Sequence, residues 1–300
     1  MYITIALIIA FIAILTLSSY IVKVLLYPKT KEYNFTLQNE IDRGNFTKEY
    51  YEELEKKDVI VKSDYGYDIH GIWIPFEDSN KTIVIVHGYT YTLFGSIKYV
   101  PVFHKLGFNV LVYDQRYHGL SGGRNSTFGY REKDDLKSVF DYLKSRFSED
   151  MIIGTHGESL GGATVLLHGA MDDRVDFVIS DCAFMDMKVQ VAYRLKVENR
   201  LPSFPFVQFA SVINKFLAGS FYYQISPISV ADKIKAPTMI IHGKSDVYTP
   251  YEQGLHLYDK LICSKRFYGA EGATHAKSIA VDGERYYEEV KAFLLENKII

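Results

Sequence analysis

Residues 152–162 of this chain read IIGTHGESLGG, and the glycines around its serine are the most informative feature of the sequence. A short apolar run leads into Ser159, with Gly157 two residues before it and Gly161 two residues after it. Glycine weakens strands and helices, so this placement requires a steric reason. A tight turn from a strand into a helix supplies one, because it brings chain segments close together and exposes the serine. The stretch therefore predicts a nucleophilic serine, provided that the rest of the chain supplies a base and an acid.

The composition limits the classes of protein to which the chain can belong. With 300 residues, 48% of them hydrophobic, the chain can bury a full core as one large domain or two small ones. A net charge of −2 gives no basic field for nucleic acid, so we expect no nucleic-acid partner. Two cysteines are too few for a disulfide framework, and no Cys/His cluster suggests zinc. We expect neither a metal nor a cofactor.

The N-terminal segment predicts a membrane anchor over residues 1–27. Residues 2–22 hold 21 positions without a charge, enough to cross a hydrocarbon core of roughly 30 Å as a helix. A buried core helix would seldom be apolar on all sides. A cleaved signal peptide is the closer alternative, but the segment lacks a basic start and an Ala-x-Ala cleavage site. Lys23, Lys29 and Lys31 follow the span, so the positive-inside bias favours a single-pass protein of the cell membrane with its bulk in the cytoplasm.

Residues 28–57 have mixed charge and predict a solvated juxtamembrane linker that carries no chemistry. The anchor then serves only to hold the protein at the membrane. We expect deletion of residues 1–30 to leave turnover of small esters unchanged. Residues 58–300 form the remaining domain.

In that domain, strand patterns alternate with helix patterns. The expected strands are 58–62, 67–74, 82–87, 108–113, 151–155, 175–180, 237–242 and 264–268. Several are continuous apolar runs, which is typical of parallel strands covered on both faces. The alternation predicts a mostly parallel α/β sheet with helices on both faces, whose ligands bind beyond the carboxyl ends of the strands.

One long stretch breaks this alternation, at about residues 183–233. It is helical in parts, rich in aromatic residues and proline, and too long for a plain crossover. We interpret it as a cap over the strand ends, and the alternative is a helix pair packed on the sheet. Its aromatic residues suggest an apolar acyl or aryl substrate group, unless they simply pack on the sheet. They are Phe204, Phe206, Phe209, Phe216, Phe221, Tyr222 and Tyr223.

Polar residues follow the expected strands at the positions where a ligand would bind. His87-Gly88-Tyr89 follows 82–87, and the Ser159 turn follows 151–155. Asp246 follows 237–242, and His275 lies in a loop after 264–268. A serine hydroxyl needs a base to become a nucleophile, and the base needs an acid that orients it. Serine, acid and histidine thus occur at strand ends in this order.

Gly-x-Ser-x-Gly after a strand, followed by acid and then histidine, resembles the α/β-hydrolase fold from about residue 60 to the C-terminus. The His-Gly pair after 82–87 and the Asp-x-Arg-x-x-His-Gly-x-Ser run from Asp114 strengthen the match. The whole chain, anchor included, resembles membrane-anchored serine hydrolases of Gram-positive bacteria. These belong to the branch that also holds monoacylglycerol lipases and serine aminopeptidases.

The resemblance makes Ser159 the nucleophile and requires the base to follow both nucleophile and acid. Of the candidates, His242 closes a strand and His256 lies within a helical pattern, which leaves His275 on a loop. Asp246 is the acid by position.

The resemblance to the α/β-hydrolase fold implies three further assignments. Asp181 is the alternative acid, because it ends the expected strand 175–180, where some relatives of this fold place the acid. By family position, the backbone N–H groups of Leu160 and Tyr89 form the oxyanion hole. Glu158 is a bystander to the chemistry.

Asp114, Arg116 and His118, with His87 and His156, invite a metal hypothesis, but their spacing fits no compact ligand set. We expect these polar groups to support the loop below the site.

These residues predict a serine hydrolase that cleaves small acyl esters through an acyl-enzyme, with lipid-like or aryl esters as candidate substrates. One alternative is a serine peptidase or amidase of the same fold. The other is a non-catalytic, membrane-tethered binding protein, which would not require all three catalytic residues.

Overall fold

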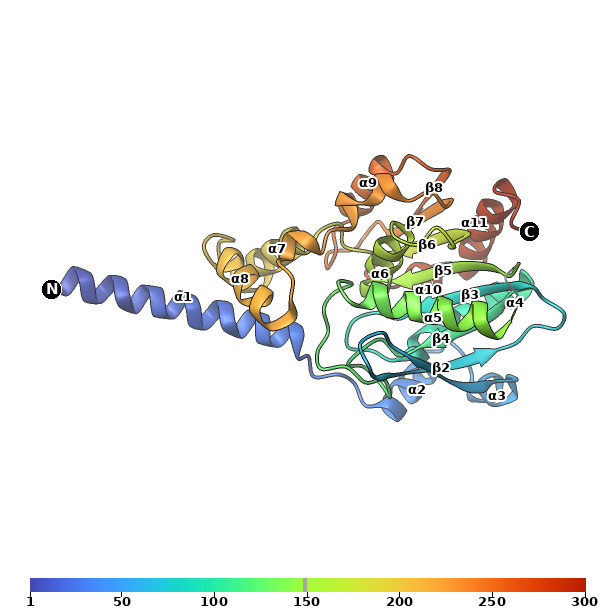
Figure 1. Ribbon diagram of the computed structural model, residues 1–300. Coiled ribbons are helices and arrows are strands. Elements are labelled where there is room, and N and C mark those ends of the chain that lie inside the picture. Colours follow the sequence, from blue (N-terminus) through green and yellow to red (C-terminus); the bar gives the residue numbers. More distant parts are fainter. Residues whose placement is uncertain (148–149) are drawn as a thin grey trace.

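The computed structural model describes residues 1–147 and 150–300, which form an α/β domain with one long helix extending from it (Figure 1). The central sheet has eight strands in the order β1-β2-β4-β3-β5-β6-β7-β8. They are β1 (Lys57–Lys62), β2 (Asp68–Ile74), β3 (Lys81–Val86), β4 (Asn109–Tyr113), β5 (Ile152–Glu158), β6 (Phe177–Asp181), β7 (Thr238–Gly243) and β8 (Lys265–Ala270). β2 pairs antiparallel with β1 and β4, and all other pairs are parallel. Each predicted strand overlaps an observed one.

Helices cover both faces of the sheet because its central strands are apolar on both sides. In β3, Val84 and Val86 face one core, and Ile83 and Ile85 face the other. The first core is closed by α5 (Glu132–Arg146), α6 (Leu160–Gly169) and α9 (Tyr251–Lys260). The second is closed by the 3₁₀ helix η1 (Leu93–Tyr99), α4 (Val100–Lys105) and α11 (Gly283–Glu296), which follows the short α10 (Ser278–Val281).

The stretch expected to form a cap lies between β6 and β7. It consists of α7 (Met187–Asn199), α8 (Phe206–Ala218) and the 3₁₀ turns η2 (Tyr222–Gln224), η3 (Pro227–Ser229) and η4 (Ala231–Lys233). α7 and α8 lie off the end of the sheet, beside the long N-terminal helix (Figure 1). This arrangement agrees with a cap and differs from a helix pair lying on a sheet face.

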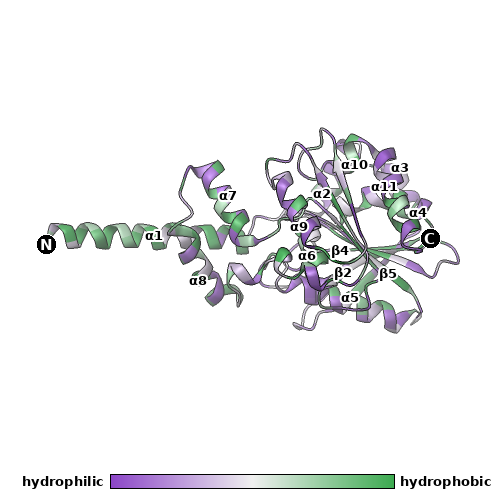
Figure 2. Cartoon of the chain, turned by 90° about the horizontal axis from the view of Figure 1, so that it is seen from above, coloured by the Kyte–Doolittle hydropathy of each residue, from purple (hydrophilic) through white to green (hydrophobic). Residues whose placement is uncertain are grey.

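The long helix is α1 (Tyr2–Leu26), which projects away from the domain and is hydrophobic along its length (Figure 2). It is long and apolar enough to cross a membrane, and only 11% of its most apolar window is buried, unlike a core helix. Its last turns are different. Val22 and Leu26 are buried in the domain core, with exposed fractions of 0% and 1%.

The expectation of a solvated linker over residues 28–57 is wrong for the helix α2 (Tyr33–Asp42), which precedes the short α3 (Lys48–Glu53). Thr36 and Glu40 on α2 are buried. The Thr36 hydroxyl lies 2.5 Å from the Thr92 hydroxyl, and Tyr33 contacts the ring of Phe94. α2 therefore packs on η1 as part of the folded domain.

Candidate active site

Ser159 lies at the sharp turn between β5 and α6, with a left-handed backbone (φ 57°, ψ −111°). For a residue other than glycine such a conformation costs about 1–3 kcal/mol. The two neighbouring glycines are required by close backbone contacts. A Cβ on Gly157 would lie 2.1 Å from the Gly161 carbonyl oxygen, and one on Gly161 would lie 2.0 Å from that of Val86. The steric reason expected from the sequence is present, and it presents the Ser159 side chain beyond the sheet.

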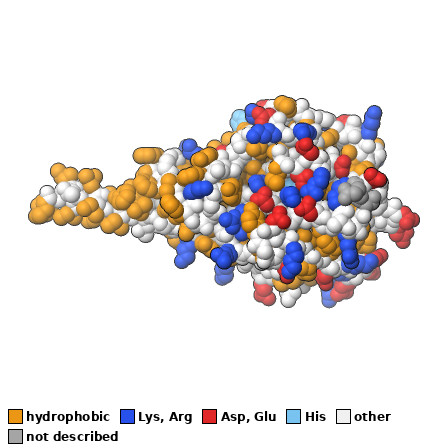
Figure 3. Space-filling model, in the orientation of Figure 1, with side chains coloured by type: hydrophobic (Ala, Val, Ile, Leu, Met, Phe, Trp, Pro, Cys, Tyr) orange, Lys and Arg blue, Asp and Glu red, His pale blue; other side chains and the backbone are white. Residues whose placement is uncertain are grey.

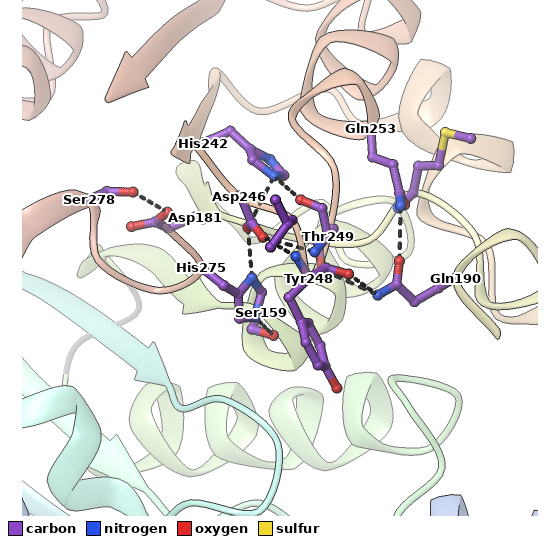
Figure 4. Close-up of polar contacts among 12 residues, drawn as sticks. Ser159, Asp181, Gln190, His242, Asp246, Tyr248, Thr249, Gln253, His275 and Ser278 are labelled. Atoms are coloured by element: carbon purple, nitrogen blue, oxygen red, sulfur yellow. Dashed lines mark hydrogen bonds and ion pairs between the residues drawn. The ribbon is translucent and has the colours of Figure 1, made fainter. Parts of the chain in front are cut away.

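The structure brings Ser159, His275 and Asp246 together from the ends of β5, β8 and β7 (Figure 4). His275 Nε2 lies 2.9 Å from Ser159 Oγ, and His275 Nδ1 lies 2.7 Å from Asp246 Oδ2. With the Nδ1 proton donated to the carboxylate, the Nε2 lone pair faces the serine hydroxyl. This is the geometry in which a histidine can accept the serine proton.

The Asp246 carboxylate is held by four groups. Its Oδ1 accepts hydrogen bonds from the backbone N–H of Tyr248 and Thr249, at 2.8 and 2.9 Å. His242 Nε2 lies 3.5 Å from Oδ2, on the side away from His275. Burial of the carboxyl raises its pKa, but the hydrogen bonds from His242 and His275 outweigh burial and lower the pKa below its ordinary value. Asp246 is therefore ionised and can stabilise a positive His275.

Asp181, the alternative acid, is placed differently. It is fully buried, and its Oδ1 accepts a hydrogen bond from the Ser278 hydroxyl at 2.9 Å. Burial raises the pKa of Asp181 to about 7. Of the two other histidines considered for the base, His256 is exposed on α9, and His242 bonds the Thr249 carbonyl oxygen through Nε2 at 2.8 Å.

Leu160 and Tyr89, predicted to donate to an oxyanion, both lie close to Ser159. Leu160 is the first residue of α6, so its N–H has no partner within the helix. Tyr89 follows Gly88, on which a Cβ would lie 3.7 Å from Ser159 Cβ. Within the described part of the chain, neither N–H donates a hydrogen bond. Both donors are thus available to a ligand at Ser159.

The polar residues after β3 and β4 hold the loop that carries Tyr89. His118 Nε2 accepts from the Thr90 N–H at 3.1 Å, and Asp114 Oδ1 accepts from the Leu93 N–H at 2.8 Å. His87 bonds the Gly88 carbonyl oxygen through Nδ1, and burial, followed by the nearby His118, lowers its pKa to about 4. These side chains bind backbone groups, in agreement with the supporting role expected from the sequence.

Two pockets meet at Ser159. The apolar pocket encloses about 290 Å³ between the end of α1, α7 and the start of α6. The polar pocket encloses about 500 Å³ on the side of His275 and is lined by Lys98, Glu158 and Lys277, together with Glu40 and Arg43 from the N-terminal segment. Tyr89 and Tyr248 line both pockets and so stand between them.

Sequence reasoning missed the contribution of the N-terminus to both pockets. The apolar pocket is lined in part by α1, through Tyr20, Ile21, Val24 and Leu25. This corrects the expectation that the N-terminal helix serves only to hold the protein at the membrane. Apolar residues in a membrane-like run give no signal of which ones face a pocket, because composition alone assigns the whole run to lipid.

Gln190 on the cap is a second residue that the sequence did not reveal. Its Nε2 donates to the Tyr248 carbonyl oxygen at 2.9 Å, and its Oε1 accepts from Gln253 Nε2 at 2.9 Å (Figure 4). Gln190 thereby ties α7 to the loop that carries Asp246. Paired glutamines distant in sequence have no local pattern that would identify them.

Glu158, the residue before the serine, belongs to a largely buried ion pair at the polar pocket, in which the Lys98 and Glu158 side chains are 9% and 13% exposed. Its Oε2 accepts from Lys98 Nζ at 2.5 Å and from the Tyr99 hydroxyl at 2.6 Å. Burial raises the pKa of Glu158, but the Lys98 charge outweighs burial and lowers it, so Glu158 is ionised. The pair lines the polar pocket, as does His275.

We expect Lys98→Met to lower the free energy of unfolding by about 3 kcal/mol, because it leaves the Glu158 charge buried and unpaired. The control is the double variant Lys98→Met/Glu158→Gln, which removes both charges and should recover much of the loss. Thermal unfolding of the detergent-purified chain measures both. A single variant as stable as the original chain would show that the pair is solvated.

Among the described residues, Cys182, Asp246 and His275 place three potential metal-ligand atoms within 4.8 Å of one another. Asp246 and His275 already bond each other. Burial raises the pKa of the Cys182 thiol well above its ordinary value, which disfavours the thiolate that a metal requires. The group fits a hydrogen-bonded triad better than a metal site.

Comparison with known proteins places this geometry in a family. Residues 99–297 match the prolyl oligopeptidase family. The uncharacterised protein YqkD of Bacillus subtilis is 40% identical over 96% of this chain and 94% of its own. The uncharacterised protein YfhR of Escherichia coli K12 is 24% identical over 74% of this chain and 72% of its own.

Solved structures share the architecture. An esterase of Pyrococcus furiosus, Pf2001, superposes with a TM-score of 0.67 and 26% identity, covering 84% of this chain and 96% of its own. The acylaminoacyl peptidase of Pyrococcus horikoshii superposes with a TM-score of 0.61 and 18% identity, covering 83% of this chain and 42% of its own, a likeness of fold alone. The predicted fold is confirmed, and the narrower resemblance to the monoacylglycerol lipase branch stays a prediction. The chain belongs to the prolyl oligopeptidase family and is a serine hydrolase of the α/β-hydrolase fold.

Proposed function

We propose that this hydrolase is a membrane-anchored esterase whose catalytic triad is Ser159, His275 and Asp246. The observation that carries the proposal is the continuous hydrogen-bonded chain from the serine hydroxyl through the imidazole to the ionised carboxylate. No separate cofactor is needed for acyl transfer by this set of groups.

The reaction proceeds in two steps. Ser159 Oγ attacks the ester carbonyl carbon while His275 Nε2 accepts the hydroxyl proton, and the backbone N–H groups of Leu160 and Tyr89 bind the oxyanion. The carbon–oxygen bond of the ester then breaks, and His275 returns the proton to the leaving alcohol. A water molecule, activated by His275, cleaves the acyl-enzyme, and the carboxylic acid leaves.

An ester rather than a peptide is supported by the apolar pocket beside Ser159 and by the likeness to an esterase at 26% identity. The prolyl oligopeptidase family match favours a peptidase or amidase as the second candidate. The two differ in the leaving group, which is an alcohol or an amine.

A single-pass anchor over residues 1–27 is supported by the length, apolar character and exposure of α1. The Ser126 N–H donates to the Leu26 carbonyl oxygen at 3.0 Å. Cleavage of a signal peptide near this point would remove that contact and the buried Val22 and Leu26, so the contacts support retention. The lysines after the span support a cytoplasmic catalytic domain.

The test uses the full chain in membrane vesicles, with p-nitrophenyl esters of graded chain length beside aminoacyl and peptidyl p-nitroanilides. We expect kcat/KM to be largest for an ester and the chain to stay with membranes after an alkaline wash. A peptidyl anilide turned over faster than every ester would favour the peptidase. Recovery of the chain in the soluble fraction would contradict the anchor.

A further inference from the structure

We infer that the last turns of α1 form one wall of the acyl-binding pocket, and that the enzyme takes a single acyl chain from an ester in the bilayer that holds its anchor. This inference rests on the proposed function and adds to it the substrate class and the residues that select it. The helix that anchors the protein would then also determine its specificity.

The first step is the direction in which a substrate must lie. The leaving group receives its proton from His275, so it must occupy the pocket that His275 lines, which is the polar one. The acyl group then extends to the other side of Ser159. That side is the apolar pocket, which Ser159 and Leu160 line together with Val24 and Leu25 of α1. The site thus separates an apolar acyl part from a polar leaving group.

The second step is that α1 is held in a fixed position relative to Ser159. The Tyr89 hydroxyl donates to the carbonyl oxygens of Leu25 at 2.8 Å and Val24 at 3.1 Å. The backbone of Tyr89 is the predicted oxyanion donor beside Ser159. Tyr89 therefore connects the reacting centre to the end of α1 by two hydrogen bonds.

The third step is the path from the bilayer. α8 of the cap packs along α1, where the rings of Phe11 and Phe209 lie 5.7 Å apart and the Ser18 hydroxyl donates to the Phe206 carbonyl oxygen. α8 also exposes large apolar side chains, with Phe216 84% and Leu217 51% exposed. Hydrophobic side chains cover α1 as far as the domain (Figure 3). This apolar surface lies beside the proposed span and suits the acyl region of a bilayer, where an ester-linked lipid resides.

The size of the pocket limits the occupant. About 290 Å³ is at the lower end of the range for small-molecule sites. One acyl chain fits this volume better than two. The substrate class is therefore a membrane-borne ester with one chain in the pocket and a polar group on the side of Lys98 and Lys277.

Val24→Trp tests the wall, since Val24 lines the pocket and is 47% exposed, so that an indole can be accommodated without entering the core. In vesicles, we expect the ratio of kcat/KM for p-nitrophenyl decanoate to that for the acetate to fall by about tenfold or more. The matched control is Ile12→Trp on the same helix, 56% exposed and outside the pocket lining, which should change the ratio by less than about twofold.

A second variant tests the same wall independently, in case Val24→Trp does not fold. Leu25→Ala removes side-chain volume from the same wall, which enlarges the pocket and should shift the preferred acyl chain length upward. The buried contacts of Val22 and Leu26 are kept. If the chain-length preference is unchanged in both Val24→Trp and Leu25→Ala, α1 is not the wall of the acyl pocket. Acetate hydrolysis lost on Ser159→Ala would still support the proposed function in that case, whereas no hydrolysis of any ester by the original chain would overturn both proposals.

The source of the substrate is tested separately with a fluorogenic palmitoyl ester placed in the vesicles that hold the enzyme or in separate vesicles. We expect hydrolysis at least about tenfold faster in the shared bilayer, because the anchor raises the local concentration of substrate. Equal rates in the two arrangements would mean that the ester reaches the site through water, which would overturn delivery from the bilayer.

Discussion

Replacing Ser159 by alanine is expected to lower kcat for the best ester by about 10⁶-fold, since loss of the nucleophile in a serine hydrolase leaves only binding and oxyanion stabilisation. The fold should be retained, because alanine keeps both backbone hydrogen bonds of Ser159, which are the N–H bond to the Asp181 carbonyl oxygen at 2.8 Å and the carbonyl bond from the Ala163 N–H at 3.0 Å. Only the hydroxyl contact with His275 is lost. Stopped-flow or endpoint release of p-nitrophenol measures the loss, and circular dichroism and thermal unfolding check the fold.

A matched control for this variant is Ser278→Ala, which removes a buried hydroxyl that bonds Asp181 rather than His275. We expect activity within about tenfold of the original chain for that variant. Turnover that survives in Ser159→Ala would place the nucleophile at another residue.

Asp246→Asn is expected to lower kcat by about 10⁴-fold, as in a serine protease whose acid is changed to the amide. Asparagine cannot stabilise a positive imidazole, and its amide group allows His275 the wrong tautomer. The pH–rate profile and the rate at saturating ester measure the effect. Asp181→Asn is the isosteric control, and we expect it to keep kcat within about tenfold because Asp181 does not contact His275. A damaging Asp181→Asn beside a harmless Asp246→Asn would reverse the assignment.

The same control variant has a second readout in stability. The folded-state pKa of Asp181 is raised to about 7 from an ordinary value of 3.8. Between these values the unfolded state binds fewer protons than the folded state, so this group lowers the free energy of unfolding as the pH rises from about 4 to about 7. Asp181→Asn removes this dependence and should gain stability relative to the original chain at pH 8 more than at pH 4.

The strands and the residues that we propose as catalytic could be picked out from the sequence because their signals are local. Continuous apolar runs mark the central parallel strands, Ser159 and Asp246 follow two of these strands within three residues, and His275 lies in the loop after β8. In an α/β sheet the carboxyl ends of neighbouring parallel strands meet at one edge, so order along the chain becomes proximity in space. The general proximity of these three residues follows from this rule, and their hydrogen-bond distances depend on the loops that carry Asp246 and His275.

The walls of the two pockets could not be predicted in the same way. Val24 lies 135 residues before Ser159 in the chain, and Glu40 lies in a segment whose mixed charge is typical of a solvated linker. Their positions depend on tertiary packing, such as the Tyr89 hydroxyl on α1 and the Thr36–Thr92 pair on α2. Long-range contacts of this kind leave no periodicity in the segments that make them. For this physical reason, the composition of residues 28–57 does not reveal that α2 packs on η1.

The role of Ser159 as the nucleophile is tested most directly by mapping the adduct of a fluorophosphonate on the full chain. The reagent forms a covalent bond only with a serine activated by a neighbouring base. We expect one adduct per chain, on the peptide that contains Ser159, and none in Asp246→Asn over the same labelling time. An adduct on any other residue, or no adduct on a chain that hydrolyses esters, would contradict the assignment of Ser159 as the nucleophile.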